Sequence, residues 1–231
     1  MSKIFIRAMK PEDWVTFFEK GEADYKKEHS AWALAHCWHE NPDDFPESIK
    51  CVFRESCLPL FQNVELLFAF PEYRVVLPPT RGHASQNDLL VVAKGEGELI
   101  AIAVEGKVSE PFDKRVCEWI AQDSQGKKER LSFLCNQLGL GKDQVSQIRY
   151  QLLHRTVSAI LMARELGARS ALMLVHSFSP QNEHFDDYGA FAALYGIEAH
   201  PDALYFAKEL GGVNLYLGWV KGDSRYLTME P

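Results

Sequence analysis

One aspartate and a Glu-x-Lys triplet are the residues of this 231-residue chain best suited to chemistry. Asp88 begins an apolar run, and Glu105-Gly106-Lys107 ends the next run along the chain. Two carboxylates can hold Mg²⁺ while the ion keeps several waters and binds phosphate oxygens. The ion lowers the pKa of a bound water, and a nearby ammonium group stabilises the negative charge that develops on phosphorus. These side chains therefore indicate metal-assisted chemistry on a phosphate ester.

A β-hairpin is the element that would bring these residues together. Residues 88–93 and 98–105 are apolar, and the turn signal Lys94-Gly-Glu-Gly97 separates them. Because the open ends of a hairpin meet, we expect Asp88 to lie beside Glu105.

Lys107 follows Glu105 by two positions, so both side chains project from the same face of a strand. The alternative is a solvated ion pair beyond the strand edge, because acid-x-base triplets arise several times by chance in a chain of this composition.

Helical and extended patterns alternate along the chain, which predicts an α/β fold with a central mixed β-sheet flanked by helices. We expect a single domain made of a helical N-terminal extension (11–59), a core (60–178) and a C-terminal helix and strand (179–231). The expected helices are 24–38, 60–70, 148–166 and 188–194. The expected strands are 73–77, 88–93, 98–105, 170–178 and 214–220.

The order helix, strand, strand with Asp, strand with Glu-x-Lys, helix, strand resembles the core of the PD-(D/E)XK, or restriction-endonuclease-like, nuclease superfamily. The resemblance covers residues 60–177, about half the chain. It implies that Asp88 and Glu105 are ligands of Mg²⁺ or Mn²⁺ and that Lys107 is the catalytic lysine. This chain departs from the pattern in having Asn87, not proline, before the aspartate.

The resemblance also directs attention to residues outside the triplet. Many members add an acid from the first core helix, for which Glu72 is the first candidate metal ligand and Glu65 the second. The alternative for both is a solvent-facing charge at the end of a helix. Some place glutamine on the helix after the lysine strand, and Gln151 and Arg155, at i and i+4, share such a helix face as candidate substrate-binding residues. The alternative for this last pair is a hydrogen-bonded pair at the boundary of the core.

Strings in several parts of the chain are also similar to those of an uncharacterised family of bacterial proteins. Examples are Ser85-Gln-Asn-Asp88 and Val175-His-Ser-Phe-Ser179. This likeness spans nearly the whole chain and implies no particular activity. It supports treating the polar residues of these strings as one site.

The net charge of −7 excludes a protein that grips nucleic acid over a broad basic surface. Five scattered cysteines without a C-x2-C pair argue against a disulfide framework or a zinc finger. The N-terminus lacks the features of a signal peptide, and no apolar run has the roughly 20 residues of a membrane span. We therefore expect a cytoplasmic protein without membrane association.

The leading functional hypothesis is a Mg²⁺- or Mn²⁺-dependent phosphodiester hydrolase of the nuclease type. Nucleic acid is then the expected partner, DNA before RNA, and a homodimer is compatible because nucleases of this superfamily often dimerise to cut two strands. The first alternative is a catalytically silent member of the fold that serves as a binding or assembly module. A third hypothesis is a metal-dependent hydrolase that acts on a small phosphorylated or nucleotide substrate.

Overall fold

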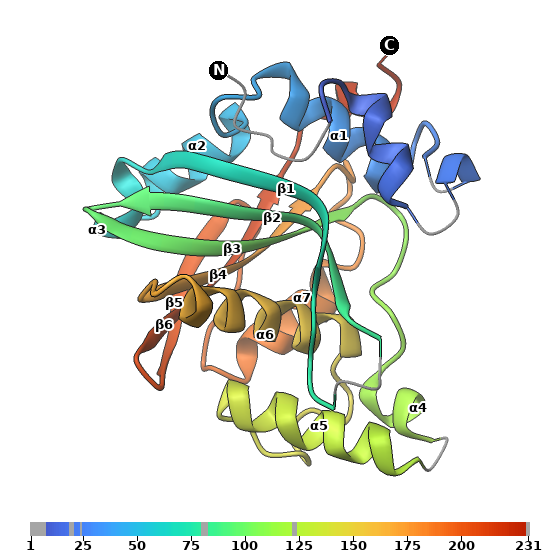
Figure 1. The fold of residues 1–231 in the computed structure, drawn as a ribbon, viewed down its shortest axis with the longest axis vertical. Coiled ribbons are helices and arrows are strands. Elements are labelled where there is room, and N and C mark those ends of the chain that lie inside the picture. The colour runs from blue at the N-terminus through green and yellow to red at the C-terminus, as the bar shows by residue number, and fades with distance from the viewer. Residues whose placement is uncertain (1–7, 19–20, 24, 80–82, 122–123, 230–231) are drawn as a thin grey trace.

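A six-stranded mixed sheet forms the centre of the molecule (Figure 1). The computed structural model describes residues 8–18, 21–23, 25–79, 83–121 and 124–229. The strand order is β1-β2-β3-β4-β6-β5, with β3, β4 and β6 parallel and the remaining pairs antiparallel. The strands are β1 (Glu65–Val75), β2 (Ser85–Gly95), β3 (Glu98–Lys107), β4 (Ser170–Ser177), β5 (Ala203–Leu210) and β6 (Val213–Lys221). The expected mixed sheet flanked by helices is thus confirmed.

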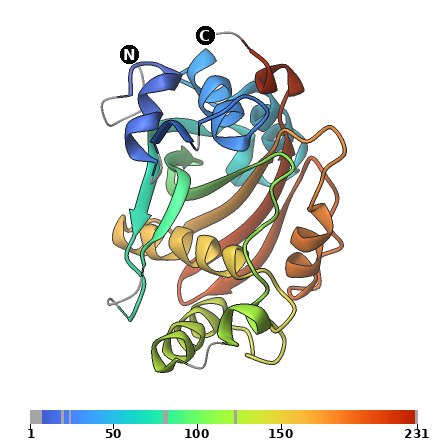
Figure 2. The same cartoon turned by 90° about the vertical axis from the view of Figure 1, so that its right-hand side faces the viewer.

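Helices cover both faces of this sheet (Figures 1 and 2). One face is covered by α1 (Ser30–Glu40), α2 (Glu47–Glu55) and α3 (Pro59–Gln62), with the short 3-10 helices Pro11–Phe17, Gly21–Ala23 and Ser224–Leu227 nearby. The other face is covered by α6 (Tyr150–Glu165) and α7 (Phe185–Ala193), and α4 (Val116–Ile120) and α5 (Gln125–Leu138) lie beyond α6. No helix of the described residues is both long and apolar enough to span a membrane.

The expected hairpin is formed by β2 and β3. Ala93 lies opposite Ile100 and Gly95 opposite Glu98, so the connection contains only two residues. Both of these, Glu96 (φ 47°) and Gly97 (φ 84°), have positive φ. Two central residues of this kind make the tight turn whose twist matches paired antiparallel strands. The turn fixes the register, and the register in turn fixes which residues meet at the open end.

Helix α6 is the crossover that makes β3 and β4 parallel neighbours. Its expected core-facing stripe is present, since Leu153, Val157 and Ile160 are fully buried and Leu161 is partly buried beside them. This stripe seats the helix on the sheet next to the end of β3. The polar positions at the start of α6 therefore lie over that same end.

The expectation of a helix over 60–70 is wrong. Only Pro59–Gln62 is helical, and strand β1 begins at Glu65 and continues through Pro71 to Val75. Proline has no N–H to give to a sheet, so it is confined to edge strands or bulges. Pro71 satisfies this rule because β1 is an edge strand that pairs only with β2.

Two further boundaries differ from the expectation. Strand β5, Ala203–Leu210, was not predicted. It is an edge strand, and its sequence alternates only weakly between apolar and charged residues. Helix α1 begins only at Ser30. Asp24, the first residue of the expected helix, lies outside the described residues. Tyr25 precedes the helix, yet its ring still packs on Trp32 with the centroids 4.8 Å apart.

A buried histidine joins the sheet to the helices on one face. His176 on β4 is fully buried, and its Nδ1 accepts a hydrogen bond of 3.3 Å from Nε1 of Trp38. Its Nε2 lies 3.2 Å from Oγ of Ser48. Burial lowers the pKa of His176 to about 3. The imidazole is therefore a neutral core group that joins β4 to α1 and α2.

This neutral histidine makes the free energy of unfolding depend on pH. An exposed imidazole has a pKa near 6.5, so below that pH the unfolded chain binds a proton that the folded chain refuses. As the pH is lowered from 6.5 to 4, this group should reduce the free energy of unfolding by up to about 1.4 kcal/mol per pH unit. His176→Gln should make the slope shallower by one proton in urea titrations across that range. An unchanged slope in the variant would contradict this assignment.

Candidate functional site

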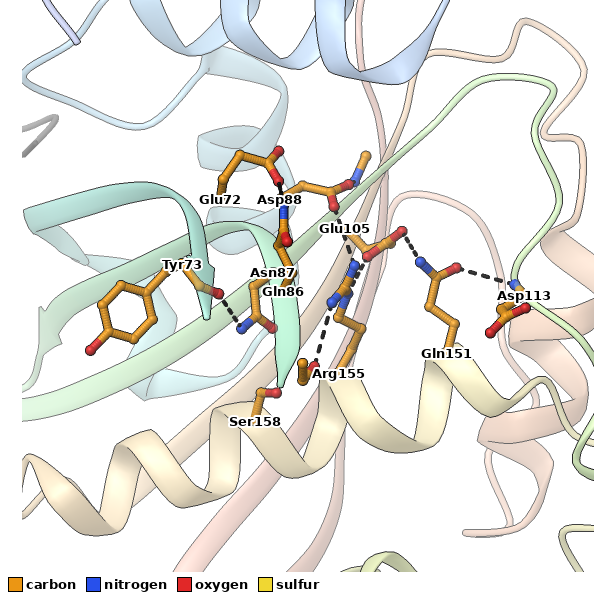
Figure 3. A network of polar contacts seen from close by, with 12 residues as sticks. Glu72, Tyr73, Gln86, Asn87, Asp88, Glu105, Asp113, Gln151, Arg155 and Ser158 are labelled. Atoms are coloured by element: carbon orange, nitrogen blue, oxygen red, sulfur yellow. Dashed lines mark hydrogen bonds and ion pairs between the residues drawn. The ribbon is translucent and has the colours of Figure 1, made fainter. Parts of the chain in front are cut away.

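The open end of the β2–β3 hairpin holds the candidate site (Figure 3). Leu89 pairs with Val104, and continuing this register by one position sets Asp88 opposite Glu105. Lys107 is the last residue of β3. Helix α6 supplies Gln151 and Arg155 from its first two turns. The four residues Asp88, Glu105, Lys107 and Arg155 thus converge from three elements, as the hairpin argument predicted for the first three.

Glu105 is the centre of this cluster, and both of its oxygens are hydrogen-bonded. Oε1 accepts from Nζ of Lys107 at 2.8 Å and from Nε2 of Gln151 at 2.7 Å. Oε2 accepts from Nε of Arg155 at 2.6 Å. The side chains of Glu105 and Lys107 are only 2% and 4% exposed. The alternative of a solvated pair beyond the strand edge is therefore wrong.

Asp88 is held more loosely and faces open space. Its Oδ2 accepts from the backbone N–H of Gly106 at 2.8 Å, and its Oδ1 lies 3.4 Å from Nη2 of Arg155. The side chain is 23% exposed. It lines a cavity of about 670 Å³, to which Gln151, Arg155 and Glu72 also contribute. Asp88 therefore faces the cavity directly, whereas the buried Glu105 is not among the residues that line it.

The guanidinium of Arg155 bridges the two carboxylates. Its Nε binds Glu105 and its Nη2 reaches Asp88, while Nη1 lies 3.4 Å from Oγ of Ser85. A fork of donors suits this task because its geometry is fixed and its charge is permanent. Gln151 in turn bridges Lys107 and Glu105: its Oε1 accepts a hydrogen bond from Lys107 at 3.2 Å, and its amide donates to Glu105. The expected i, i+4 pair thus acts as one polar face toward the site.

The two facing carboxylates have very different proton affinities. Burial alone would raise the pKa of Glu105, but Arg155 and Lys107 outweigh burial and lower the pKa to about 2. Burial, with the charge of Glu105 as the next cause, raises the pKa of Asp88 to about 7. Glu105 is therefore a permanent anion. The ionised form of Asp88 is less well stabilised, because fewer positive charges lie close to it.

Glu72 lies near the site, although not on the helix expected for it. It occupies strand β1 between the pairs Pro71–Leu89 and Tyr73–Asn87, which sets it opposite Asp88. Its Oε2 accepts from Nε2 of Gln86 at 2.6 Å (Figure 3). Burial, and then the charge of Asp88, raise the pKa of Glu72 well above its usual range.

Glu65, the second candidate acid, is at the far end of the same strand. It pairs with Lys94, next to the hairpin turn. The structure therefore separates Glu65 from the open end of the hairpin, and it plays no part in the site.

Gln86 belongs to the string Ser85-Gln-Asn-Asp88, whose polar residues the sequence groups into one site, but its own role was not predicted: it orients Glu72 and also lines the cavity. A signal for it exists, because Gln86 is two positions before Asp88 and so projects from the same face of β2.

The donor set fits a magnesium-like ion bound by few protein ligands. Among the described residues, no group of three or more His, Cys, Asp or Glu side chains is arranged to hold a metal. Mg²⁺, however, is commonly bound by one or two carboxylates together with waters and substrate phosphates. Asp88 and Glu105 could provide these two carboxylates, and a dication would offset the burial and the repulsion between carboxylates that raise the pKa values of Asp88 and Glu72. Arg155 would have to withdraw from between Asp88 and Glu105 to admit the ion.

Comparison with protein families matches residues 7–224 of the chain to a domain of unknown function, DUF6946. The chain belongs to this family. No curated protein and no solved structure gives a significant match to the chain. The family assignment covers the whole sheet and the candidate site and carries no assigned activity.

The buried ions around Glu105 give a test of the geometry. Glu105→Gln keeps the shape of the side chain but leaves Lys107 and Arg155 without their shared anion. Removing one partner of a buried charge cluster typically costs about 3–5 kcal/mol. Urea unfolding at pH 7.5 with EDTA should show a loss of that order.

Glu47→Gln is the matched control. Glu47 contacts Lys50 and Arg54 at an exposed position on α2, so its replacement should leave stability nearly unchanged. A loss for Glu105→Gln no larger than that of the control would show that the buried cluster does not hold the fold together.

Proposed function

We propose that the protein is a Mg²⁺- or Mn²⁺-dependent phosphodiester hydrolase with its active site at the open end of the β2–β3 hairpin. One observation carries the proposal: Asp88, Glu105 and Lys107 converge with Gln151 and Arg155 beside a cavity of about 670 Å³. Two carboxylates with an ammonium and a guanidinium group supply both the donors that a dication needs and the charge that a phosphate needs.

Asp88 and Glu105 would hold the ion in this proposal. The bound ion supplies Lewis-acid stabilisation of the phosphate charge and lowers the pKa of a water. Water adds to phosphorus while the bond from phosphorus to the leaving sugar oxygen breaks. One proton of the water ends on that oxygen, and the hydroxyl stays on the phosphate.

The cations of the chain would then stabilise the charge that builds up. Lys107 donates to Glu105 and Gln151, and its Nζ lies 4.8 Å from the centre of the Phe112 ring, so it would act on the phosphate through its positive charge. Arg155, on withdrawing from Asp88, can turn its fork toward the phosphate, a geometry that guanidinium groups match well. Gln151 would orient Lys107 through the hydrogen bond between them.

A second candidate function rests on Arg155. Its guanidinium contacts both carboxylates and so occupies the position between them. If it stays there, it acts as a built-in counterion. The protein would then be a silent member of the fold that serves as a binding or assembly module.

Calorimetry with metal ions distinguishes the two functions. We expect the wild type to bind Mn²⁺ with a micromolar Kd and Asp88→Asn to lose this binding. Asp143→Asn, the same charge change at an exposed position away from the cavity, should bind as the wild type does. Absence of any Mn²⁺ binding by the wild type would favour the silent module and contradict the hydrolase.

Cleavage assays test the role of Lys107. With labelled single-stranded and duplex DNA and RNA in Mg²⁺ or Mn²⁺, Lys107→Met should lower the cleavage rate by on the order of 10²–10³-fold, because a preorganised positive charge is removed. Lys114→Met, which removes an exposed lysine outside the cavity, should cut at the wild-type rate. Circular dichroism and thermal unfolding confirm that each variant is folded. Equal rates for Lys107→Met and the wild type would refute the role of Lys107.

A further inference from the structure

A second cavity adjoins the candidate active site. It has a volume of about 490 Å³ and shares four lining residues with the first cavity: His83, Ala84, Asp113 and His154. This size is within the range of small-molecule sites. The remaining walls come mainly from α4, α5 and the start of α6. The two cavities therefore meet, with carboxylates at one end and a different set of groups at the other.

A buried arginine forms part of the second cavity. Arg130 on α5 is 6% exposed, and its guanidinium donates to the backbone oxygens of Leu77, Pro79 and His83 at 2.9–3.3 Å. Among the described residues, its Nε has no hydrogen-bond partner and no carboxylate forms an ion pair with it. Buried charges are ordinarily paired. Arg130 has no ion pair of its own among the described residues, although Asp113 also lines the cavity, and this favours an anionic ligand beside Arg130.

An aromatic wall stands beside this cation. The rings of Trp119 and Tyr150 stack with their centroids 4.0 Å apart and an angle of 11° between the planes. Nζ of Lys127 lies 5.4 Å from the centre of the Trp119 ring. Planar aromatic surfaces interleaved with basic groups are the common basis for binding unpaired nucleotides.

The local charge agrees with such a ligand. Residues 113–149, which include α4 and α5, contain seven lysines and arginines against five acids, in a chain whose net charge is −7. The lining of the second cavity itself includes two cations, Lys127 and Arg130, and the acid Asp113. A cavity of this size admits a single nucleotide, whereas a double helix is ordinarily bound over a broad basic surface.

We propose that the second cavity binds one unpaired nucleotide of the substrate, with its base in place of Lys127 on the Trp119 face that Tyr150 does not cover, and a phosphate near Arg130 and the displaced Lys127. The identification of this ligand as part of a nucleic acid rests on the proposed hydrolase function. The enzyme then acts on single strands or on frayed ends rather than on intact duplex, because the nucleotide next to the scissile phosphate must be unstacked to enter.

Tryptophan fluorescence provides a direct readout. Trp14, Trp32, Trp38 and Trp219 are each at most 8% exposed, while Trp119 is partly exposed at the cavity. With metal removed by EDTA, titration with dAMP should quench the emission, and inorganic phosphate or adenosine alone should quench it far less. By calorimetry, Trp119→Leu should bind dAMP about tenfold more weakly. Single-stranded DNA should compete with dAMP, and a blunt duplex should not.

Adjacent lysines on α5 provide the matched pair of variants. Lys127 lines the cavity, whereas Lys128 is exposed and does not. Lys127→Met should weaken dAMP binding severalfold and Lys128→Met should not. Equal effects of the two, or no quenching by millimolar dAMP, would overturn the inference.

The outcomes also separate the inference from the proposed function. Binding of dAMP without cleavage of any nucleic acid supports the nucleotide site and overturns the hydrolase. Cleavage of nucleic acid without dAMP binding supports the hydrolase and overturns the nucleotide site.

Discussion

The buried carboxylate of Glu105 is the constraint on which this end of the structure depends. An anion with 2% of its side chain exposed is tolerated only when it is surrounded by donors. Lys107 comes from the same strand, but Gln151 and Arg155 come from α6. The crossover helix must therefore begin over the end of β3, with its first two turns facing the sheet. The apolar stripe of Leu153, Val157 and Ile160 then continues the same contact along the helix.

Satisfying Glu105 leaves its neighbours short of positive charge. Lys107 and Arg155 are both engaged by Glu105, so Asp88 has only the N–H of Gly106 and a long contact to Arg155. Glu72 accepts a hydrogen bond from the side-chain amide of Gln86, and among the described residues no cation forms an ion pair with it. Burial is the largest cause of the raised pKa values of Asp88 and Glu72, and no cation close to these carboxylates offsets it fully. The same arrangement that stabilises one carboxylate thus leaves two others suited to an additional cation.

The convergence of Asp88, Glu105 and Lys107 could be predicted from sequence because it depends on local rules. A two-residue turn fixes the register of a hairpin, and the register fixes which side chains meet at its open end. Gln151 and Arg155 followed from helical spacing. The position of Glu72 was less accessible: the aromatic run before Pro71 suits a helix as well as a strand, and Pro71 resembles a helix stop. Only the pairing of β1 at the sheet edge decides between them.

Arg130 illustrates what sequence alone could not provide. Its guanidinium donates to backbone oxygens 47 to 53 positions earlier in the chain, and the spacing of apolar and polar residues in α5 does not predict that contact. The same long-range packing bears on the apparent conflict between an acidic chain and the anionic substrate that we propose. Attraction does not require an excess of positive charge over the whole surface when basic and aromatic groups are gathered at one end of a cavity. The acidic groups at the other end then repel phosphate only until a cation is bound between them, so metal binding and substrate binding would reinforce each other.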